Sequence, residues 1–361
     1  MKVTGLRTKA IALPLPEPLS TSIHRIEKIG CLLVWLDGTD GVSGEALLFT
    51  LNTGRLAVLD AMVRTLAPVV VGRQASDRTA VWNDMWSDIN FVGHKGVSLF
   101  AIAAIDTALW DLAGKDTGLS VAALLGRARD RIPAYASGGL WLSRSIDALQ
   151  QEAQSFLDQG FRAMKMRLGS KRIADDVERA LAIREVIGPD VQLMSDANQG
   201  LTVSHAIALG RALEPANLAW FEEPVQAYDL AGSAEVAAAV PMPVASGETE
   251  YARYGFRDMI ERKSAYVLMP DLQRVGGITE FMRVAAMASA YDLPVSPHVF
   301  TEYSLQLCGA IAHCPVTEHM PWFTALYNEQ MEMADGDLLI PDRPGLGFTF
   351  DQGAVDRLGI D

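Results

Sequence analysis

The sequence predicts an α/β protein in which a closed parallel barrel follows a smaller α+β unit. From Arg131 onward, eight short apolar runs alternate with amphipathic stretches, and each pair takes up about 25 residues. Eight such pairs in succession are typical of a parallel barrel with its helices outside. Before residue 126, β-rich runs and one long helical stretch follow a different order. We therefore expect residues 1–125 to form an α+β unit, 126–326 the barrel, and 327–361 a C-terminal segment.

Two features predict the α+β unit. The run CLLVWLDGTDGVSGEALL is typical of strand, turn and strand, because its β-rich halves flank Asp-Gly and Ser-Gly pairs. From Val97 to Gly114, apolar side chains recur at helical spacing, and Gly114 is placed to end that helix. We expect the apolar face of this helix to lie in the core.

The barrel prediction depends on eight candidate strands. In chain order they are IPAYASG, AMKMRLG, VQLMSDAN, LAWFEEP, MPVASGE, AYVLMPD, LPVSPH and TEHMPW. Amphipathic stretches such as IDALQQEAQSFLDQG lie between them and fit outer helices. The segment after Tyr327 is rich in loop residues, and we expect it to return to the first unit.

Composition excludes several classes of partner. The formal net charge of -13 opposes attraction to nucleic acid or to anionic membranes, since both need a basic surface. No segment reaches the roughly 18 consecutive apolar residues of a membrane span, and the first residues do not resemble a cleavable leader. Three cysteines are too few, and odd in number, for a disulfide framework. We expect a cytoplasmic homo-oligomer that acts on a small molecule.

Three carboxylates end consecutive strand candidates at equal intervals. Asp196 ends VQLMSD, Glu222 ends LAWFE and Glu248 ends VASGE. The carboxyl ends of barrel strands meet at one rim, where barrel enzymes carry their active sites. Three acids brought together there would repel one another, so a divalent cation is expected among them, and all-oxygen ligands suit Mg²⁺. Glu223 should point to the other face, because side chains alternate along a strand.

Further polar residues fall at the same rim. Lys165 and Arg167 lie two apart on AMKMRLG, so they share a strand face, which we expect to face the carboxylates across the barrel. Asp271 and His298 end two later strand candidates, and Glu318 lies near the end of the last. Histidine accepts a proton near neutral pH, and a neighbouring carboxylate fixes its tautomer. His298 is therefore the candidate base, with Asp271 as its partner.

Two other groupings favour different sites only weakly. His313, Cys314, Cys308 and His319 lie close in sequence, but they lack the short ligand spacings of zinc sites. Gly276-Gly277 opens a predicted helix without the rest of a phosphate-binding pattern.

The motifs together resemble a known family. The stretch AIAAIDTALWDLAGKDTGLSVAALLG (residues 101–126) is similar to the signature helix of the mandelate racemase and muconate lactonizing enzyme family of the enolase superfamily. The order K-x-R, D-x-N, E-E-P, G-E, D and P-H resembles the mandelate racemase branch, and the likeness covers nearly the whole chain. It implies a capping α+β domain, a modified TIM barrel, (β/α)₇β, and Mg²⁺ on Asp196, Glu222 and Glu248. It also implies that Asn198 contacts substrate.

The resemblance implies a reaction as well. Removal of a proton next to a carboxylate gives an enediolate, which Mg²⁺, Lys165 and Arg167 would stabilise and to which Glu318, if protonated, could donate. The racemase pattern carries K-x-K, and its second lysine is a base, whereas a guanidinium is a poor base. Arg167 therefore favours one-sided chemistry at His298. The simplest such reaction is dehydration of a sugar acid to a 2-keto-3-deoxy acid.

Alternatives remain open at this point. An epimerase, racemase or lactone cycloisomerase on the same scaffold would need a second acid/base, such as Lys165 or a capping-loop residue. A metal-binding barrel without catalytic activity is the alternative from another class.

Substrate identity is expected to depend on capping loops. His24 and Arg25, in STSIHRI, and His94 and Lys95, in NFVGHKG, are expected to reach over the barrel mouth. Such contacts favour an anionic or heavily hydroxylated far end, hence an aldarate or aldonate.

Overall fold

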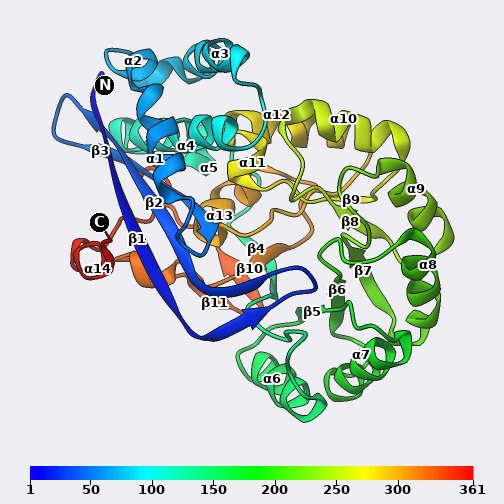
Figure 1. The fold of residues 1–361 in the computed structure, drawn as a ribbon. Helices are drawn as coiled ribbons and strands as arrows, with labels where there is room; N and C mark the ends of the chain where they lie inside the picture. Colours follow the sequence, from blue (N-terminus) through cyan, green and yellow to red (C-terminus); the bar gives the residue numbers. More distant parts are fainter. Residues whose placement is uncertain (361) are drawn as a thin grey trace.

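A three-stranded antiparallel sheet stands beside a parallel barrel in the computed structural model, which describes residues 1–360 (Figure 1). The predicted strand, turn and strand are confirmed, since β2 and β3 pair antiparallel. The strands of this sheet are β1 (Val3–Ser20), β2 (Arg25–Gly38) and β3 (Ser43–Leu51). Its helices are α1 (Leu56–Thr65), α2 (Ala67–Val70), α3 (Arg78–Asp88), α4 (Val97–Thr117) and α5 (Val121–Leu125), with 3₁₀ turns η1 (Ala75–Asp77) and η2 (Ile89–Phe91).

Helix α4 is the central helix of the cap, and most of its residues are buried. The predicted end at Gly114 is wrong. The helix continues to Thr117, and Gly118 ends it in the left-handed conformation (φ 70°). Gly114 instead lies where a Cβ would come within 2.6 Å of the Gly345 Cα, so it allows two backbones to approach. Within residues 1–360, α4 is the one helix long and apolar enough to cross a membrane, and 83% of that apolar window is buried as protein core.

Parallel strands form the barrel in chain order. They are β4 (Arg131–Ala136), β5 (Ala163–Arg167), β6 (Gln192–Asp196), β7 (Leu218–Glu222), β8 (Val244–Ser246), β9 (Val267–Leu268) and β10 (Thr317–His319). Each pairs with the next as far as β9, and β10 pairs with β4.

The predicted strand LPVSPH is not a regular strand. Its backbone lies beside β9 and makes two isolated parallel bridges, Leu268 with Val295 and Asp271 with His298. Pro294 and Pro297 lack an N–H, so a continuous ladder cannot form there. The segment still occupies the seventh strand position, between β9 and β10.

Seven strand positions are each followed by helix, and β10 is followed by the short turn η4 (Thr324–Leu326). The predicted (β/α)₇β arrangement is thereby confirmed within the described residues. The helices are α6 (Ile146–Asp158), α7 (Ile173–Ile187), α8 (Val203–Ala212), α9 (Leu230–Ala239), α10 (Ala252–Arg262), α11 (Leu272–Val275) with α12 (Ile278–Ser289), and α13 (Thr301–Ala310); a 3₁₀ turn, η3 (Glu214–Ala216), follows α8.

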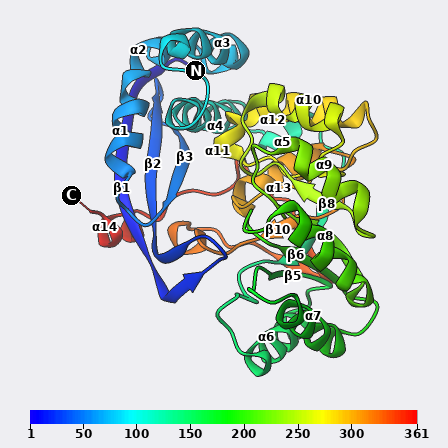
Figure 2. The ribbon, with the colours of Figure 1, turned by 45° about the vertical axis from the view of Figure 1, so that its right-hand side comes forward.

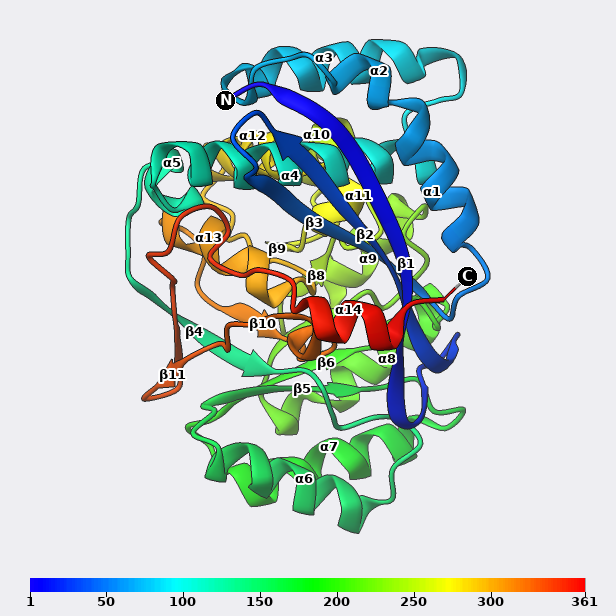
Figure 3. The same ribbon diagram turned by 90° about the vertical axis from the view of Figure 1, so that its left-hand side faces the viewer.

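The last segment contacts both parts of the molecule. It contains β11 (Met333–Ala334), β12 (Asp337–Leu339) and α14 (Gln352–Leu358), and β12 pairs antiparallel with β4 of the barrel. Farther on, the ring of Phe350 packs against Trp35 (centroids 5.4 Å apart), and α14 lies beside β1 (Figure 3). This return to the first sheet matches the expectation for the tail, while the boundaries at residues 125 and 326 stay predictions.

Two buried aspartates of α4 join the cap to the rest of the chain. Asp106 accepts hydrogen bonds from the Thr279 backbone N–H (2.8 Å) and hydroxyl (2.6 Å) at the start of α12. Its carboxylate fills the space beside Gly277, so the Gly-Gly pair serves helix capping. Asp111 accepts from the backbone N–H groups of Leu346 and Glu45 (2.7 and 2.8 Å).

Candidate active site

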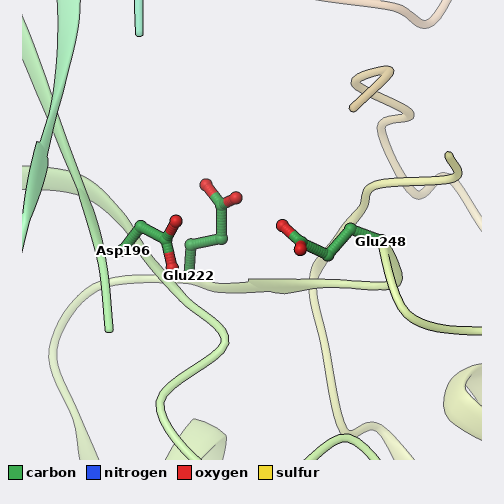
Figure 4. A group of neighbouring side chains, drawn as sticks. All are labelled: Asp196, Glu222 and Glu248. Carbon is green, nitrogen blue, oxygen red and sulfur yellow. The ribbon is translucent and has the colours of Figure 1, made fainter. Parts of the chain in front are cut away.

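Three carboxylates meet at the carboxyl end of the barrel. Asp196 and Glu222 are the last residues of β6 and β7, and Glu248 lies two residues beyond β8. One oxygen from each lies within 4.8 Å of the others, and Figure 4 shows the three side chains directed into one space. Register explains this convergence, since Asp196 pairs with Glu222 across the β6–β7 ladder. The grouping predicted from equal spacing is confirmed.

The negative charges of these three carboxylates repel one another. Burial, with the nearby charges of Asp196 and Glu248, raises the pKa of Glu222 to about 8 even though Lys165 opposes the rise. Burial likewise raises the pKa of Asp196. A divalent cation would relieve this repulsion, and a set made only of carboxylate oxygens suits a hard ion such as Mg²⁺. The residues present therefore fit the metal that the sequence predicts.

Asn198 and Glu223 stabilise the residues around the three carboxylates. Asn198 donates to Asp196 from its backbone N–H (2.7 Å) and its side-chain amide (2.9 Å), which fixes the carboxylate. It also lines the cavity described below. Glu223 accepts from Gln199 (2.8 Å) and Thr249 (3.1 Å), and so links the loops that follow β6 and β8. Its carboxylate therefore supports those loops.

Lys165 lies beside the carboxylates, not across the barrel as predicted, because β5 is the neighbour of β6. Its Nζ is 2.8 Å from Glu222 Oε1 and 3.0 Å from Glu318 Oε1. Burial alone would lower the pKa of Lys165, but the two carboxylates outweigh it and raise that pKa above its usual range. Lys165 is thus a fixed cation in this geometry.

Arg167 stands next to Lys165 with part of its hydrogen-bonding capacity unused. It donates to the Ser137 hydroxyl (3.2 Å), lies 3.5 Å from Asp196 Oδ2 and stacks over Trp141 (4.7 Å). Its Nε and Nη1 are buried and donate no hydrogen bond within the described residues. Buried guanidinium donors without partners are costly, so a ligand oxygen is the natural acceptor here.

His298 and Asp271 form the predicted pair. His298 Nδ1 is 2.8 Å from Asp271 Oδ2, and its Nε2 is 3.3 Å from Glu248 Oε2. Asp271 is itself fixed, because its other oxygen accepts the backbone N–H groups of Gln273 and Arg274 at the start of α11. Burial would lower the pKa of His298, but Glu248, Asp271 and Glu318 outweigh it and raise that pKa to about 9.

Glu318 is not protonated in this geometry, so it does not have the proton that it would need to donate to an enediolate. Burial would raise its pKa, but Lys165, His298 and two hydrogen bonds lower that pKa to about 2. Those bonds come from the Ser137 hydroxyl (2.6 Å) and the Val299 backbone N–H (2.6 Å). In this geometry Glu318 is ionised and accepts, so its contribution is to hold Lys165 and Ser137 in place.

An open cavity of about 590 Å³, counted with its mouth, lies over these groups. Of the predicted capping-loop residues, His24 lines it. Its loop is docked on the barrel by Ser22, whose hydroxyl donates to the Ala197 carbonyl (2.7 Å), and Figure 2 shows the β1–β2 turn directed toward the barrel. The loop position therefore brings one of the four predicted side chains to the cavity.

The other three capping-loop residues lie outside the lining of this cavity, and their contact with substrate stays a prediction. Arg25 is exposed and lies 3.5 Å from Glu27. His94 stacks on the Trp86 ring (3.9 Å), and Lys95 lies 3.4 Å from Glu250. Each of these side chains has a local partner outside the cavity lining, which explains its position.

Comparison with protein-family models matches both parts of the chain. Residues 4–126 match the mandelate racemase / muconate lactonizing enzyme N-terminal domain, and residues 148–354 match the enolase C-terminal domain-like model. The chain belongs to the mandelate racemase/muconate lactonizing enzyme family.

Members of this family with known activities are similar over nearly full length. L-talarate/galactarate dehydratase of Salmonella typhimurium is 32% identical over 98% of this chain and 90% of its own. The 3,6-anhydro-alpha-L-galactonate cycloisomerase of Streptomyces coelicolor is 33% identical over 99% of both chains. The crystal structure of L-talarate dehydratase from Polaromonas sp. JS666, complexed with Mg and L-glucarate, superposes with a TM-score of 0.92 at 35% identity, covering 100% of this chain and 98% of that one.

Sequence reasoning missed several residues of this family site. Ser137 bridges Arg167 and Glu318, and Arg274 lines the cavity beside Asp271. Arg274 follows Asp271 by one helical turn, a spacing that predicts contact when both residues are helical. No comparable signal was available for the aromatic lining, because Phe49, Trp141 and Trp322 come from three distant parts of the chain.

Proposed function

We propose that this protein is a Mg²⁺-dependent dehydratase that removes the proton next to the carboxylate of a sugar acid and eliminates water to give a 2-keto-3-deoxy acid. The observation that carries the proposal is the His298–Asp271 pair beside a three-carboxylate site, with a permanent cation at Arg167. The talarate/galactarate dehydratase of Salmonella typhimurium, similar over nearly the whole chain, supports this class of carbon–oxygen lyase.

Asp196, Glu222 and Glu248 would hold the Mg²⁺, which supplies electrophilic stabilisation of the negative charge that develops on the substrate carboxylate. Lys165 and Arg167 provide fixed cations next to this position. The unpartnered Nη1 of Arg167 is the group that would bind a carboxylate or enediolate oxygen, because its Nε faces Asp196 Oδ2 at 3.5 Å. Glu318 and Ser137 keep both cations in place.

His298 moves the protons. Its Nε2 accepts the proton from C2, while Asp271 holds Nδ1 and stabilises the imidazolium. The imidazolium then returns a proton to the hydroxyl on C3 as the C3–O bond breaks, so water leaves and the C2–C3 enol becomes a ketone. The charge of Glu248 helps to raise the pKa of His298 to about 9. A divalent cation bound by Glu248 would neutralise that charge and so lower the pKa of His298 toward the range in which imidazole acts as a base.

A cycloisomerase is the second candidate. The Streptomyces coelicolor cycloisomerase is similar over 99% of this chain, so sequence similarity alone does not separate the two reactions. Arg167 argues against epimerisation, because that reaction needs a second titrating group, whereas dehydration at one face needs only His298. This argument does not distinguish a cycloisomerase from a dehydratase, so the product formed decides between these two candidates.

The test is product formation from a panel of sugar acids with Mg²⁺, read as 2-keto-3-deoxy acid. We expect turnover that chelation abolishes and that His298→Asn reduces by at least about 10³-fold, since one acid/base residue serves both proton transfers. His94→Asn, a matched change outside the cavity, should keep activity. A lactone or an epimer as the sole product would contradict the dehydratase and favour the second candidate.

We further propose that the protein is a cytoplasmic homo-oligomer. All three cysteines are free and buried, which fits a reducing compartment. Phe91 and Val92, after α3, are exposed apolar side chains of the kind that an interface between subunits covers. Light scattering tests the oligomeric state, and cell fractionation tests the cytoplasmic location.

A further inference from the structure

Three residues next to the carboxylates of the metal site have an uncommon backbone conformation. Asn198, Gln199 and Glu223 have positive φ angles of 45°, 61° and 38°. Residues with a Cβ adopt this left-handed conformation rarely, and they keep it only where neighbouring contacts hold the backbone. The first two follow Asp196 within three positions, and the third comes directly after Glu222. The contacts that hold these residues therefore also act on the loops of the metal site.

The side-chain amide of Gln199 joins the loops that follow three strands. Its Nε2 donates to Glu223 Oε2 and to Thr249 Oγ1, both at 2.8 Å. Its Oε1 accepts the backbone N–H of Ala227 (3.0 Å), so the amide has donors and acceptors on the correct sides. Gln199 itself follows β6, whereas its partners follow β7 and β8. One half-buried side chain thus connects three consecutive loops of the barrel.

The backbone of Gln199 belongs to the same network. Its N–H donates to the Glu223 carbonyl (2.7 Å), and its carbonyl accepts the side-chain amide of Gln226 (2.8 Å). The Thr249 hydroxyl donates to the second carboxylate oxygen of Glu223 (3.1 Å), which closes the network. Each polar atom of Gln199 therefore has a partner on a neighbouring loop. Gln199 does not line the cavity, so these partners account for its hydrogen bonds without a ligand.

Each loop in this network carries one of the three carboxylates of the metal site (Figure 4). Asp196 lies three residues before Gln199, while Glu222 and Glu248 each lie immediately before a residue that accepts from its amide. The carboxylates repel one another, and they come from separate loops. A bridge that holds these loops together reduces the reorganisation that ion binding requires, and this raises affinity.

We propose that Gln199 is a positioning residue for the magnesium site. It acts through the three loops and holds Asp196, Glu222 and Glu248 at the separation that Mg²⁺ requires, without contact to the ion or to substrate. Mg²⁺ is small and demands nearly ideal octahedral geometry, whereas Ca²⁺ accepts looser and more variable ligand sets. Gln199 therefore contributes to the choice of metal as well as to affinity. The inference depends on the metal site alone and holds for any reaction carried out there.

The variant Gln199→Met tests this role, because methionine has a similar length and no amide to donate from. Calorimetric titration of Mg²⁺, and separately of Ca²⁺, into chelator-treated protein measures both dissociation constants. We expect Kd for Mg²⁺ to rise about 10- to 100-fold, the usual effect of losing a residue that orients metal ligands. Kd for Ca²⁺ should rise less, so that the preference for Mg²⁺ over Ca²⁺ falls about threefold or more.

Two controls separate positioning from general stability. Gln150→Met makes the same replacement at another half-buried glutamine, whose amide donates to the Ala182 carbonyl (3.1 Å) between α6 and α7. It should leave both dissociation constants unchanged. Thermal unfolding without metal shows how much stability each variant loses by itself.

A second pair of variants carries the test if Gln199→Met does not fold. Thr249→Val removes the hydroxyl that accepts from Gln199, whereas Thr249→Ser keeps it. We expect the valine variant to weaken Mg²⁺ binding and the serine variant to bind like the unmodified protein. In the double variant with Gln199→Met, the loss of affinity should be smaller than the product of the two single losses, since both changes break the same bridge.

The outcomes distinguish the inference from the site on which it depends. Unchanged Kd for Mg²⁺ in Gln199→Met or, where that variant does not fold, in Thr249→Val would overturn the positioning role and leave the metal site standing. Loss of Mg²⁺ and Ca²⁺ affinity by the same factor would overturn the claim that Gln199 sets the ligand separation. If the unmodified protein bound no Mg²⁺, the metal site would fail, and the inference with it.

Discussion

At position 167 a guanidinium occupies the place where the racemase pattern has a lysine, and a guanidinium is a poor base whatever its surroundings. It stacks over Trp141 and lies 3.5 Å from Asp196. Exchange of a substrate proton with solvent needs a group that cycles between its protonated and free forms. We therefore expect that in D₂O only the substrate epimer whose C2 hydrogen faces His298 exchanges. Proton NMR of both C2 epimers measures this, and exchange of both by the unmodified enzyme would contradict one-base chemistry.

The Arg167→Lys variant separates two roles of this residue. The ammonium keeps a charge but loses the planar donors and the stacking on Trp141, so we expect kcat to fall about 100- to 1000-fold, the usual range for removing one such stabilising donor. Stereochemistry should stay unchanged if the position is only electrostatic. Steady-state rates and the same NMR exchange assay give the two readouts. New exchange of the second epimer would show that the geometry supports a second base.

Individual site residues were predictable where strand periodicity places them. Asp196, Glu222 and Glu248 end consecutive strands, so position in the sequence determines position in space. Loop residues carry no such rule. Arg25 and Lys95 are cations in the predicted loops, but they lie near local acids, Glu27 and Glu250, and do not line the cavity.

At the scale of elements, errors in the sequence prediction came from tertiary contacts. Gly114 looked like a helix end, but its missing side chain serves the approach of Gly345. The run LPVSPH has the composition of a strand, but its two prolines reduce the ladder to isolated bridges. Periodicity identifies which face is buried, whereas a close backbone approach is visible only in the folded chain.

The link between α4 and α12 predicts a pH dependence of stability. Burial raises the pKa of Asp106 from 3.8 to about 7, although Thr279 hydrogen bonds oppose the rise. The folded protein therefore binds this proton more tightly than the unfolded chain does. Its contribution to stability is fully present below about pH 3.8 and is lost as pH rises through about 7, a change on the order of 4 kcal/mol for a shift of this size.

The variant Asp106→Asn should remove this dependence, since the amide keeps an acceptor for the Thr279 N–H and does not ionise. We expect the stability of the variant relative to the unmodified protein to rise between pH 5.5 and pH 8.5. Urea unfolding at several pH values measures the difference. A constant difference across that range would show that Asp106 does not titrate there.

For the whole molecule, the alternation of strands and helices was sufficient to predict the barrel, and the β-rich start predicted the cap. The sequence did not show how the cap closes the site. Ser22 joins the β1–β2 turn to Ala197, and Phe49 joins β3 to aromatic residues beyond β10. These contacts connect residues more than a hundred positions apart, and no local pattern encodes them.

Convergence of acids from three strands also predicts that Mg²⁺ stabilises the fold. The unfolded chain does not hold Asp196, Glu222 and Glu248 together, so the ion binds the folded state preferentially. At a free Mg²⁺ concentration about 100 times Kd, this linkage adds about 2.7 kcal/mol, which should raise Tm by several degrees. Thermal unfolding in Mg²⁺, compared with KCl of equal ionic strength, separates binding from screening of the repulsion. Glu248→Gln removes one ligand and should lose most of the Mg²⁺ shift. Equal shifts in KCl, or in this variant, would show that the three carboxylates do not act together as a magnesium site.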